Sequence, residues 1–182
     1  MSMTLNPVNE AAFQKAVQSL ETLNRAAVFH PTGTGKSCIA WKVVEAHPQT
    51  TFFWLVAGAQ RLALRQAELT RYNGGTLPGN VRFCDCEKLA AATPEQWVRL
   101  GEQKPGCIVL DCYHELSAVC WAQSVQKLLR MCPQAKVLGL GVPNGAPVCA
   151  AAQELFADCI VSHMTVAEAM AAGTMPVPSA YA

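Results

Sequence analysis

The residues with the clearest chemistry lie together in one segment, Pro31-Thr32-Gly33-Thr34-Gly35-Lys36-Ser37. Its two glycines open backbone conformations that other residues rarely adopt, so consecutive N–H groups can turn inward around an anion. In a phosphate-binding (Walker A) loop, the lysine reaches the β- and γ-phosphates and the following hydroxyl contacts Mg²⁺. The segment therefore predicts a nucleotide site whose contacts come from Thr32, Gly33, Thr34, Gly35, Lys36 and Ser37, with Ser37 also at the metal.

A second candidate for chemistry is Asp111, which ends the apolar run Gly106-Cys107-Ile108-Val109-Leu110. Such a run predicts a buried strand, and a carboxylate at its carboxyl end lies where parallel sheets collect their ligands. His114 follows three positions later. We expect it to belong to the same site rather than to be a satisfied polar residue beside the sheet.

The elements that must position these residues alternate between strand and helix. The loop lies between an apolar run at 26–29 and a helix that ends near residue 46, ahead of Pro48. Patterning predicts further strands at 51–57, 81–85, 106–111, 136–140 and 155–161, and further helices at 9–23, 60–71, 118–131, 165–173 and from residue 93. Asn9 is expected to cap the first helix, and Thr93 and Thr165 each begin a capping box. This alternation favours an α/β sandwich of three layers, with a mostly parallel sheet and helices on both faces.

Composition narrows the class of protein. The 182 residues are 51% apolar and 15% charged, which suits one globular domain with a full core. The net charge of +1 excludes a strongly basic surface, so any contact with nucleic acid must be local. Nine cysteines without a CxxC pair argue against a zinc site. Neither a leader nor an apolar run long enough to span a bilayer is present, so we expect a cytoplasmic protein without a membrane partner.

Residues 31–37, together with Asp111-Cys112-Tyr113-His114, resemble motifs I and II of the superfamily 2 DEAD/DEAH-box helicases. The motif order from Phe13 to Tyr181 is similar to that of the first, RecA-like ATP-binding lobe of this family. The resemblance implies a P-loop NTPase fold with ATP and Mg²⁺ as cofactors. Asp111 would hold the water shell of Mg²⁺ opposite Ser37, with His114 completing motif II.

Further consequences of the resemblance concern the adenine base and the partners of the protein. Gln14 lies 22 positions before Lys36 and is similar to the family glutamine that hydrogen bonds adenine; the alternative is a solvated residue of the helix face. Arg61 and Arg65 stand near motif Ia, where they would meet a nucleic-acid phosphate or remain solvated charges. We expect a single lobe over residues 1–182, without the second helicase lobe, and with DNA preferred to RNA as partner. Whether a second lobe is supplied in trans stays open at the level of sequence.

Two motifs depart from the family pattern. Cys112 stands where the family has the glutamate that activates water, and general-base assistance is typically worth about 10²- to 10⁴-fold. The motif III segment is Gly139-Leu140-Gly141-Val142-Pro143-Asn144, so both threonine hydroxyls are missing. Asp85 and Glu87 would also repel a phosphate backbone at a third family contact. The resemblance thus implies a helicase-type ATP hydrolase that is weak or inactive as an isolated lobe.

Two alternatives stay open at the level of sequence. The first is a stand-alone degenerate module that binds ATP or a partner without hydrolysis. The second is a small phosphate-loop kinase, which would need a substrate lid after the core. Nothing from Gly145 to Ala182 has the pattern of such a lid.

Overall fold

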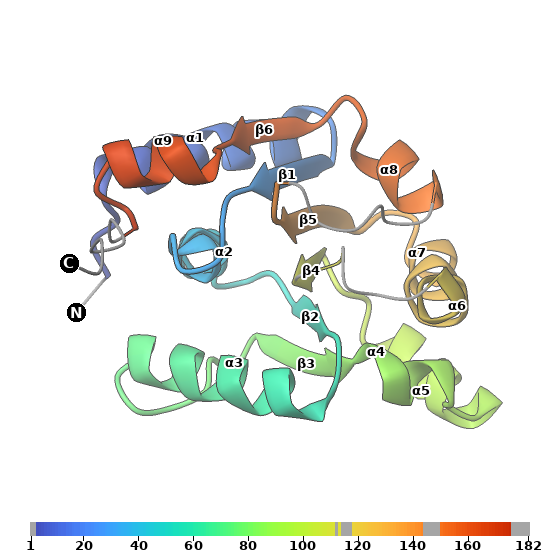
Figure 1. Cartoon of the computed structure of the whole chain (residues 1–182). Coiled ribbons are helices and arrows are strands. Elements are labelled where there is room, and N and C mark those ends of the chain that lie inside the picture. Colours follow the sequence, from blue (N-terminus) through green and yellow to red (C-terminus); the bar gives the residue numbers. More distant parts are fainter. Residues whose placement is uncertain (1–2, 112, 114–117, 144–149, 176–182) are drawn as a thin grey trace.

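The computed structural model describes residues 3–111, 113, 118–143 and 150–175 (Figure 1). Its centre is one six-stranded sheet of order β3-β2-β4-β5-β1-β6, and every pairing between neighbours is parallel. This arrangement confirms the predicted α/β class and is that of a RecA-like fold. The strands are β1 (Arg25–Phe29), β2 (Phe52–Val56), β3 (Val81–Asp85), β4 (Cys107–Asp111), β5 (Lys136–Gly141) and β6 (Ile160–His163).

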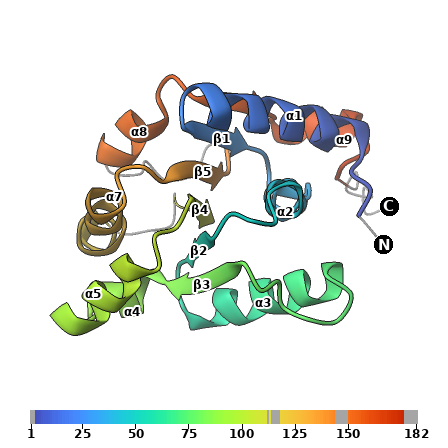
Figure 2. The same ribbon diagram turned by 180° about the vertical axis from the view of Figure 1, so that it is seen from behind.

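Helices cover both faces of the sheet, as Figures 1 and 2 show from opposite sides. One buried cluster joins the sheet to α1 (Pro7–Thr22), α2 (Lys36–Ala46) and α3 (Ala59–Tyr72). The second cluster joins the other face to the remaining covering helices, which are α4 (Cys86–Ala90), α5 (Pro94–Glu102), α6 (Ala118–Cys120), the π-helix η2 (Trp121–Gln126), α7 (Lys127–Met131) and α8 (Ala150–Phe156). The short α9 (Val166–Ala171) follows β6.

Successive side chains of β4 point to opposite faces of the sheet and so pack against different helical layers. Val109 belongs to the cluster under α1–α3, whereas Ile108 and Leu110 belong to the opposite cluster. Because successive residues of a strand point to opposite faces, Asp111 lies on the α1–α3 side. The helix that starts at the glycine loop, α2, covers that same side.

Both predicted capping boxes are confirmed. The side chains of Thr93 and Thr165 each accept from the backbone N–H three residues on, and the Gln96 and Glu168 side chains accept from the cap backbone in return. Asn9, in contrast, is not the cap of α1. That role belongs to Asn6, whose Oδ1 accepts from the Asn9 N–H at 2.8 Å.

The strand predicted at 155–161 is wrong in its first half, because α8 continues to Phe156 and β6 begins only at Ile160. The apolar residues of this run belong to two elements, and periodicity cannot separate them in so short a stretch. Phe156 is buried against Gly139 of β5, where an added Cβ would lie 2.6 Å from the ring. The Phe156 side chain therefore packs into the core from a helix and not from a strand.

Asp85 also has a different role from the one expected of it. It ends β3, is 6% exposed, and its Oδ1 accepts from the Glu87 N–H at 3.0 Å as the cap of α4. Its carboxylate therefore stabilises a helix start. Among the described helices, none combines the length and apolar character needed to cross a membrane.

Candidate nucleotide site

The glycine loop connects β1 to α2 at the carboxyl edge of the sheet. Gly33 and Gly35 adopt φ angles of 87° and 88°, a left-handed region that costs glycine little. Gly35 is also the N-cap of α2, and a Cβ at this position would lie 2.8 Å from the Asn9 amide nitrogen. The loop therefore requires glycine at residue 35 for two independent reasons, its backbone angle and the close approach of α1.

Within the loop, hydrogen bonds converge on two carbonyl oxygens. Lys36 is 8% exposed, and its ammonium donates to the carbonyls of His30 at 2.7 Å and Pro31 at 2.8 Å. The Thr34 hydroxyl donates to the same Pro31 carbonyl at 2.8 Å. Thr32 and Gly33 form the exposed part of the turn. A phosphate bound here would compete with the two carbonyls for the lysine.

His30 ties the start of the loop to the neighbouring strands. It is fully buried. Its backbone N–H donates to the Gly141 carbonyl at 3.2 Å, and its Nε2 lies 2.7 Å from the Ser162 hydroxyl. Burial, followed by the charges of Lys36 and His163, lowers the pKa of His30 to about 4. The imidazole is therefore neutral near pH 7 and supports the loop without adding charge to it.

Asn9 is a contact of the loop that sequence reasoning missed. It is 3% exposed, and its Nδ2 donates to the Thr34 carbonyl at 2.8 Å. Its Oδ1 is buried and has no hydrogen-bond partner within the described residues. The predicted adenine ligand, Gln14, is exposed and donates to Glu10 at 2.8 Å. Five helical positions separate Asn9 from Gln14, a rotation of about 140°, so both cannot face the loop.

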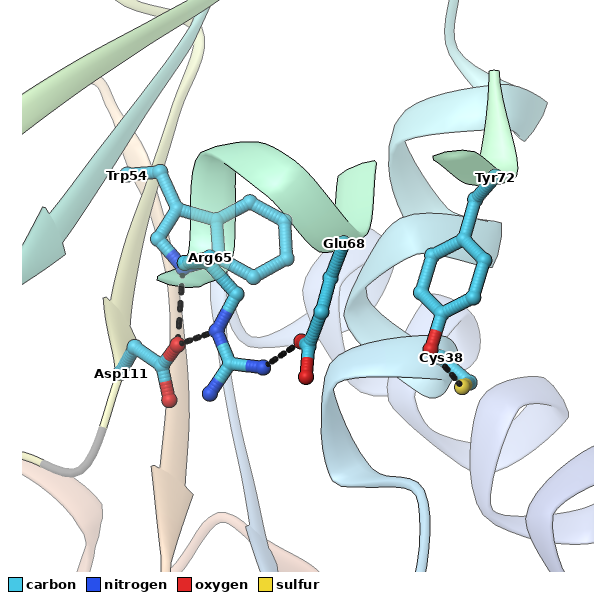
Figure 3. A network of polar contacts seen from close by, with 6 residues as sticks. All are labelled: Cys38, Trp54, Arg65, Glu68, Tyr72 and Asp111. Carbon is cyan, nitrogen blue, oxygen red and sulfur yellow. Dashed lines mark hydrogen bonds and ion pairs between the residues drawn. The ribbon is translucent and has the colours of Figure 1, made fainter. Parts of the chain in front are cut away.

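Asp111 lies at the end of β4, where it is 3% exposed and accepts two hydrogen bonds (Figure 3). Its Oδ2 accepts from the Trp54 indole at 3.1 Å and from Arg65 Nε at 2.5 Å. Arg65 also donates to Glu68 within α3. Burial by itself would lower the pKa of Arg65, but the two carboxylates outweigh it and raise that pKa.

The sheet order brings the loop and Asp111 to the same edge. β5 lies between β1 and β4, with Phe29 paired to Gly141 and Asp111 to Leu140. Two strand spacings correspond to about 10 Å between β1 and β4. Ser37 is the second residue of α2, which covers the Asp111 side of the sheet, so the start of this helix and the carboxylate lie on the same side.

These donors fit magnesium better than a metal that needs an all-protein site. Mg²⁺ usually takes one or two carboxylates or hydroxyls together with phosphate and water. In the part of the chain that the structure describes, no group of three or more His, Cys, Asp or Glu side chains could hold a metal. Ser37 and Asp111 are thus the residues that would hold the ion next to a nucleotide.

Motif II lies only partly within the structure. Cys112 and His114 lie outside the described residues. Tyr113 is described, and it packs into the cluster on the other face, with its ring 5.8 Å from that of Phe29 and 5.1 Å from that of Phe156. Burial raises the pKa of the Tyr113 hydroxyl. Its role in the described structure is packing behind the carboxyl end of β4.

Comparison with known proteins adds support at the level of fold. No family model matches the sequence, and no curated protein matches it. Among solved structures, the chain is similar to one described as ATP-dependent Type ISP restriction-modification enzyme LlaBIII bound to DNA. The TM-score is 0.62 at 12% sequence identity, and the match covers 93% of this chain but 16% of that one. At this identity the likeness shows the fold alone.

Proposed function

We propose that the protein is a helicase-type ATP-binding lobe that binds Mg·ATP in the space between the glycine loop and Asp111. The observation that carries this proposal is the placement of a Gly-Lys-Ser helix start and a strand-terminal carboxylate at one edge and one side of a parallel sheet. Backbone N–H groups at the start of α2 would bind the phosphates, because a helix N-terminus attracts anions. The similarity to a DNA-bound, ATP-dependent enzyme supports nucleic acid as the partner, with DNA favoured.

Each site residue has a separate task in this proposal. Lys36 would leave the carbonyls of His30 and Pro31 and pair with the β- and γ-phosphates. Ser37 and Asp111 would hold magnesium, which when bound neutralises charge on the phosphates. Asn9 would keep the loop against α1 through its bond to Thr34. None of these residues replaces the glutamate that Cys112 displaces, so we expect binding with slow hydrolysis.

Titration calorimetry with Mg·ATP tests this proposal directly. Lys36→Ala should weaken binding about ten- to a hundredfold, since a hydrogen bond to a charged group contributes roughly 1.5–3 kcal/mol. Lys42→Ala is the matched control, because Lys42 lies in the same helix but pairs with Glu45 at 2.7 Å. Equal binding by both variants, or no binding by the wild type, would contradict the proposed function.

A second candidate is a stand-alone degenerate module that binds nucleotide or a partner without hydrolysis. Gly141 stands at one of the missing threonine positions of motif III, and an added Cβ there would lie 2.8 Å from the Phe29 ring, so the packing of β5 accounts for the absence of this threonine. Cys112→Glu separates the two candidates. A rise in ATPase rate of about 10²- to 10⁴-fold would locate the defect at this base, whereas an unchanged rate favours the non-hydrolysing module.

A further inference from the structure

The Asp111 carboxylate receives two donors on one of its oxygens. Trp54 Nε1 reaches Oδ2 from β2, and Arg65 Nε reaches the same atom from α3 (Figure 3). Within the described residues, Oδ1 takes part in no hydrogen bond with another side chain or with the backbone. The carboxylate is therefore held through one oxygen while the other is left for a further ligand.

The two donors are themselves rigidly placed. Trp54 is fully buried in a central strand, so its indole has little freedom to move. The Arg65 guanidinium is bound on a second side by Glu68, three residues further along α3. Two carboxylates and one guanidinium leave this group with one net negative charge, so a cation is still attracted to it.

We propose that Trp54 and Arg65 are positioning residues that orient Asp111 toward magnesium, an inference that rests on the proposed function. Carboxylates that ligate metals are usually held by hydrogen bonds from a surrounding shell, and loss of such a partner typically costs about 10- to 100-fold in metal affinity. Arg65 thereby has a different task from the one its sequence position suggests. It serves the metal carboxylate and does not contact a nucleic-acid phosphate.

The distinguishing measurement is the magnesium dependence of nucleotide binding. The ratio of the ADP dissociation constants in EDTA and in saturating Mg²⁺ isolates the contribution of the ion to nucleotide binding. Mn²⁺ binding, followed by electron paramagnetic resonance, measures the affinity of the metal site without catalysis. Arg65→Gln and Trp54→Phe should each reduce that ratio and weaken Mn²⁺ binding, by about tenfold or more for Arg65→Gln. ADP affinity in EDTA and affinity for a single-stranded oligonucleotide should stay at the wild-type level.

Each variant has a matched control in the chain. Arg71→Gln removes an exposed arginine from the same helix. Trp41→Phe removes a buried indole N–H that has no hydrogen-bond partner among the described residues. Both controls should keep the wild-type ratio. Trp54→Phe keeps an aromatic ring and the Arg65–Asp111 ion pair while removing the indole N–H. It therefore tests the inference even if Arg65→Gln, which leaves a buried carboxylate unpaired, fails to fold.

The possible outcomes separate this inference from the proposed function. A wild type that binds ADP in neither condition overturns the proposed function and the inference with it. Wild-type binding with a clear magnesium dependence that neither Trp54→Phe nor Arg65→Gln alters overturns the inference alone. Loss of oligonucleotide affinity in Arg65→Gln at an unchanged magnesium ratio does the same, because Arg65 would then be a nucleic-acid contact.

Discussion

Substitution of His30 by glutamine should remove a large part of the acid sensitivity of the fold. Glutamine can keep a polar atom near the Ser162 hydroxyl, which lies 2.7 Å from the imidazole Nε2, but it does not titrate. In the wild type, burial and the Lys36 charge lower the pKa of His30 to about 4 from its ordinary 6.5. The unfolded chain therefore binds more protons than the folded protein between these two values, and stability rises with pH in this window.

The size of this effect follows from the two pKa values. When the pH falls from 7 to 4, His30 becomes protonated more readily in the unfolded chain than in the folded protein. This difference should lower the free energy of unfolding by about 3 kcal/mol, mostly between pH 6.5 and 4. Such a loss is a large part of the roughly 5–15 kcal/mol that is typical of natural domains.

Urea unfolding of the wild type and His30→Gln at half-unit steps from pH 4 to 7 measures the difference. Carboxylates also titrate in this range, but they are common to both proteins and cancel in the difference curve. We expect the glutamine variant to gain stability relative to the wild type as the pH falls. Parallel curves for the two proteins would show that the folded imidazole is protonated as readily as the unfolded one, and would refute the account of His30 as a neutral buried support.

Three further substitutions test packing, the loop and capping. Gly139→Ala should lower the free energy of unfolding, measured with urea, by about 1–3 kcal/mol, because its Cβ would lie 2.6 Å from the Phe156 ring. Adding Phe156→Leu to this variant should recover part of the lost stability. Gly79→Ala is the control, because a Cβ at Gly79 would have nothing within 4 Å. Asn9→Ala should weaken Mg·ATP binding in calorimetry by about tenfold, since the buried Thr34 carbonyl loses its donor; affinity equal to that of the wild type would count against its role. Thr93→Ala should lower the unfolding free energy by about 1 kcal/mol through loss of the α5 capping box, and no change in the urea midpoint would contradict this.

The sequence was sufficient where structure follows from neighbouring residues. The Thr93 and Thr165 capping boxes need only a side chain and the backbone three positions on, and both are present. The same is true of the glycine loop, because the left-handed angles of Gly33 and Gly35 are permitted by residue type alone. Alternation of strand and helix predicted the parallel α/β sheet, because a connection between parallel strands needs a crossover.

Tertiary structure decided which side chains meet across the fold. The sequence pointed to Gln14 as an adenine ligand, which stays a prediction, but it did not point to Asn9. The rotation of α1 directs Asn9 to the loop and leaves Gln14 on the exposed face with Glu10. The sequence suggested a nucleic-acid phosphate as the partner of Arg65, but the packing of α3 against β2 and β3 brings Arg65 to Asp111, 46 positions away. The sequence predicted no partner for His30, because the Ser162 hydroxyl that it contacts lies 132 positions further along the chain.

The physical reason for this division is the range of the forces involved. Capping, glycine angles and apolar periodicity act over a few residues, so they can be read along the chain. The partner of a buried polar group is instead the nearest group that packing brings within about 3 Å, whatever its distance in sequence. The chain alone therefore determined a glycine-loop motif on a parallel α/β framework. The folded protein decided that Asn9 and His30 support the loop and that Trp54 and Arg65 bind Asp111.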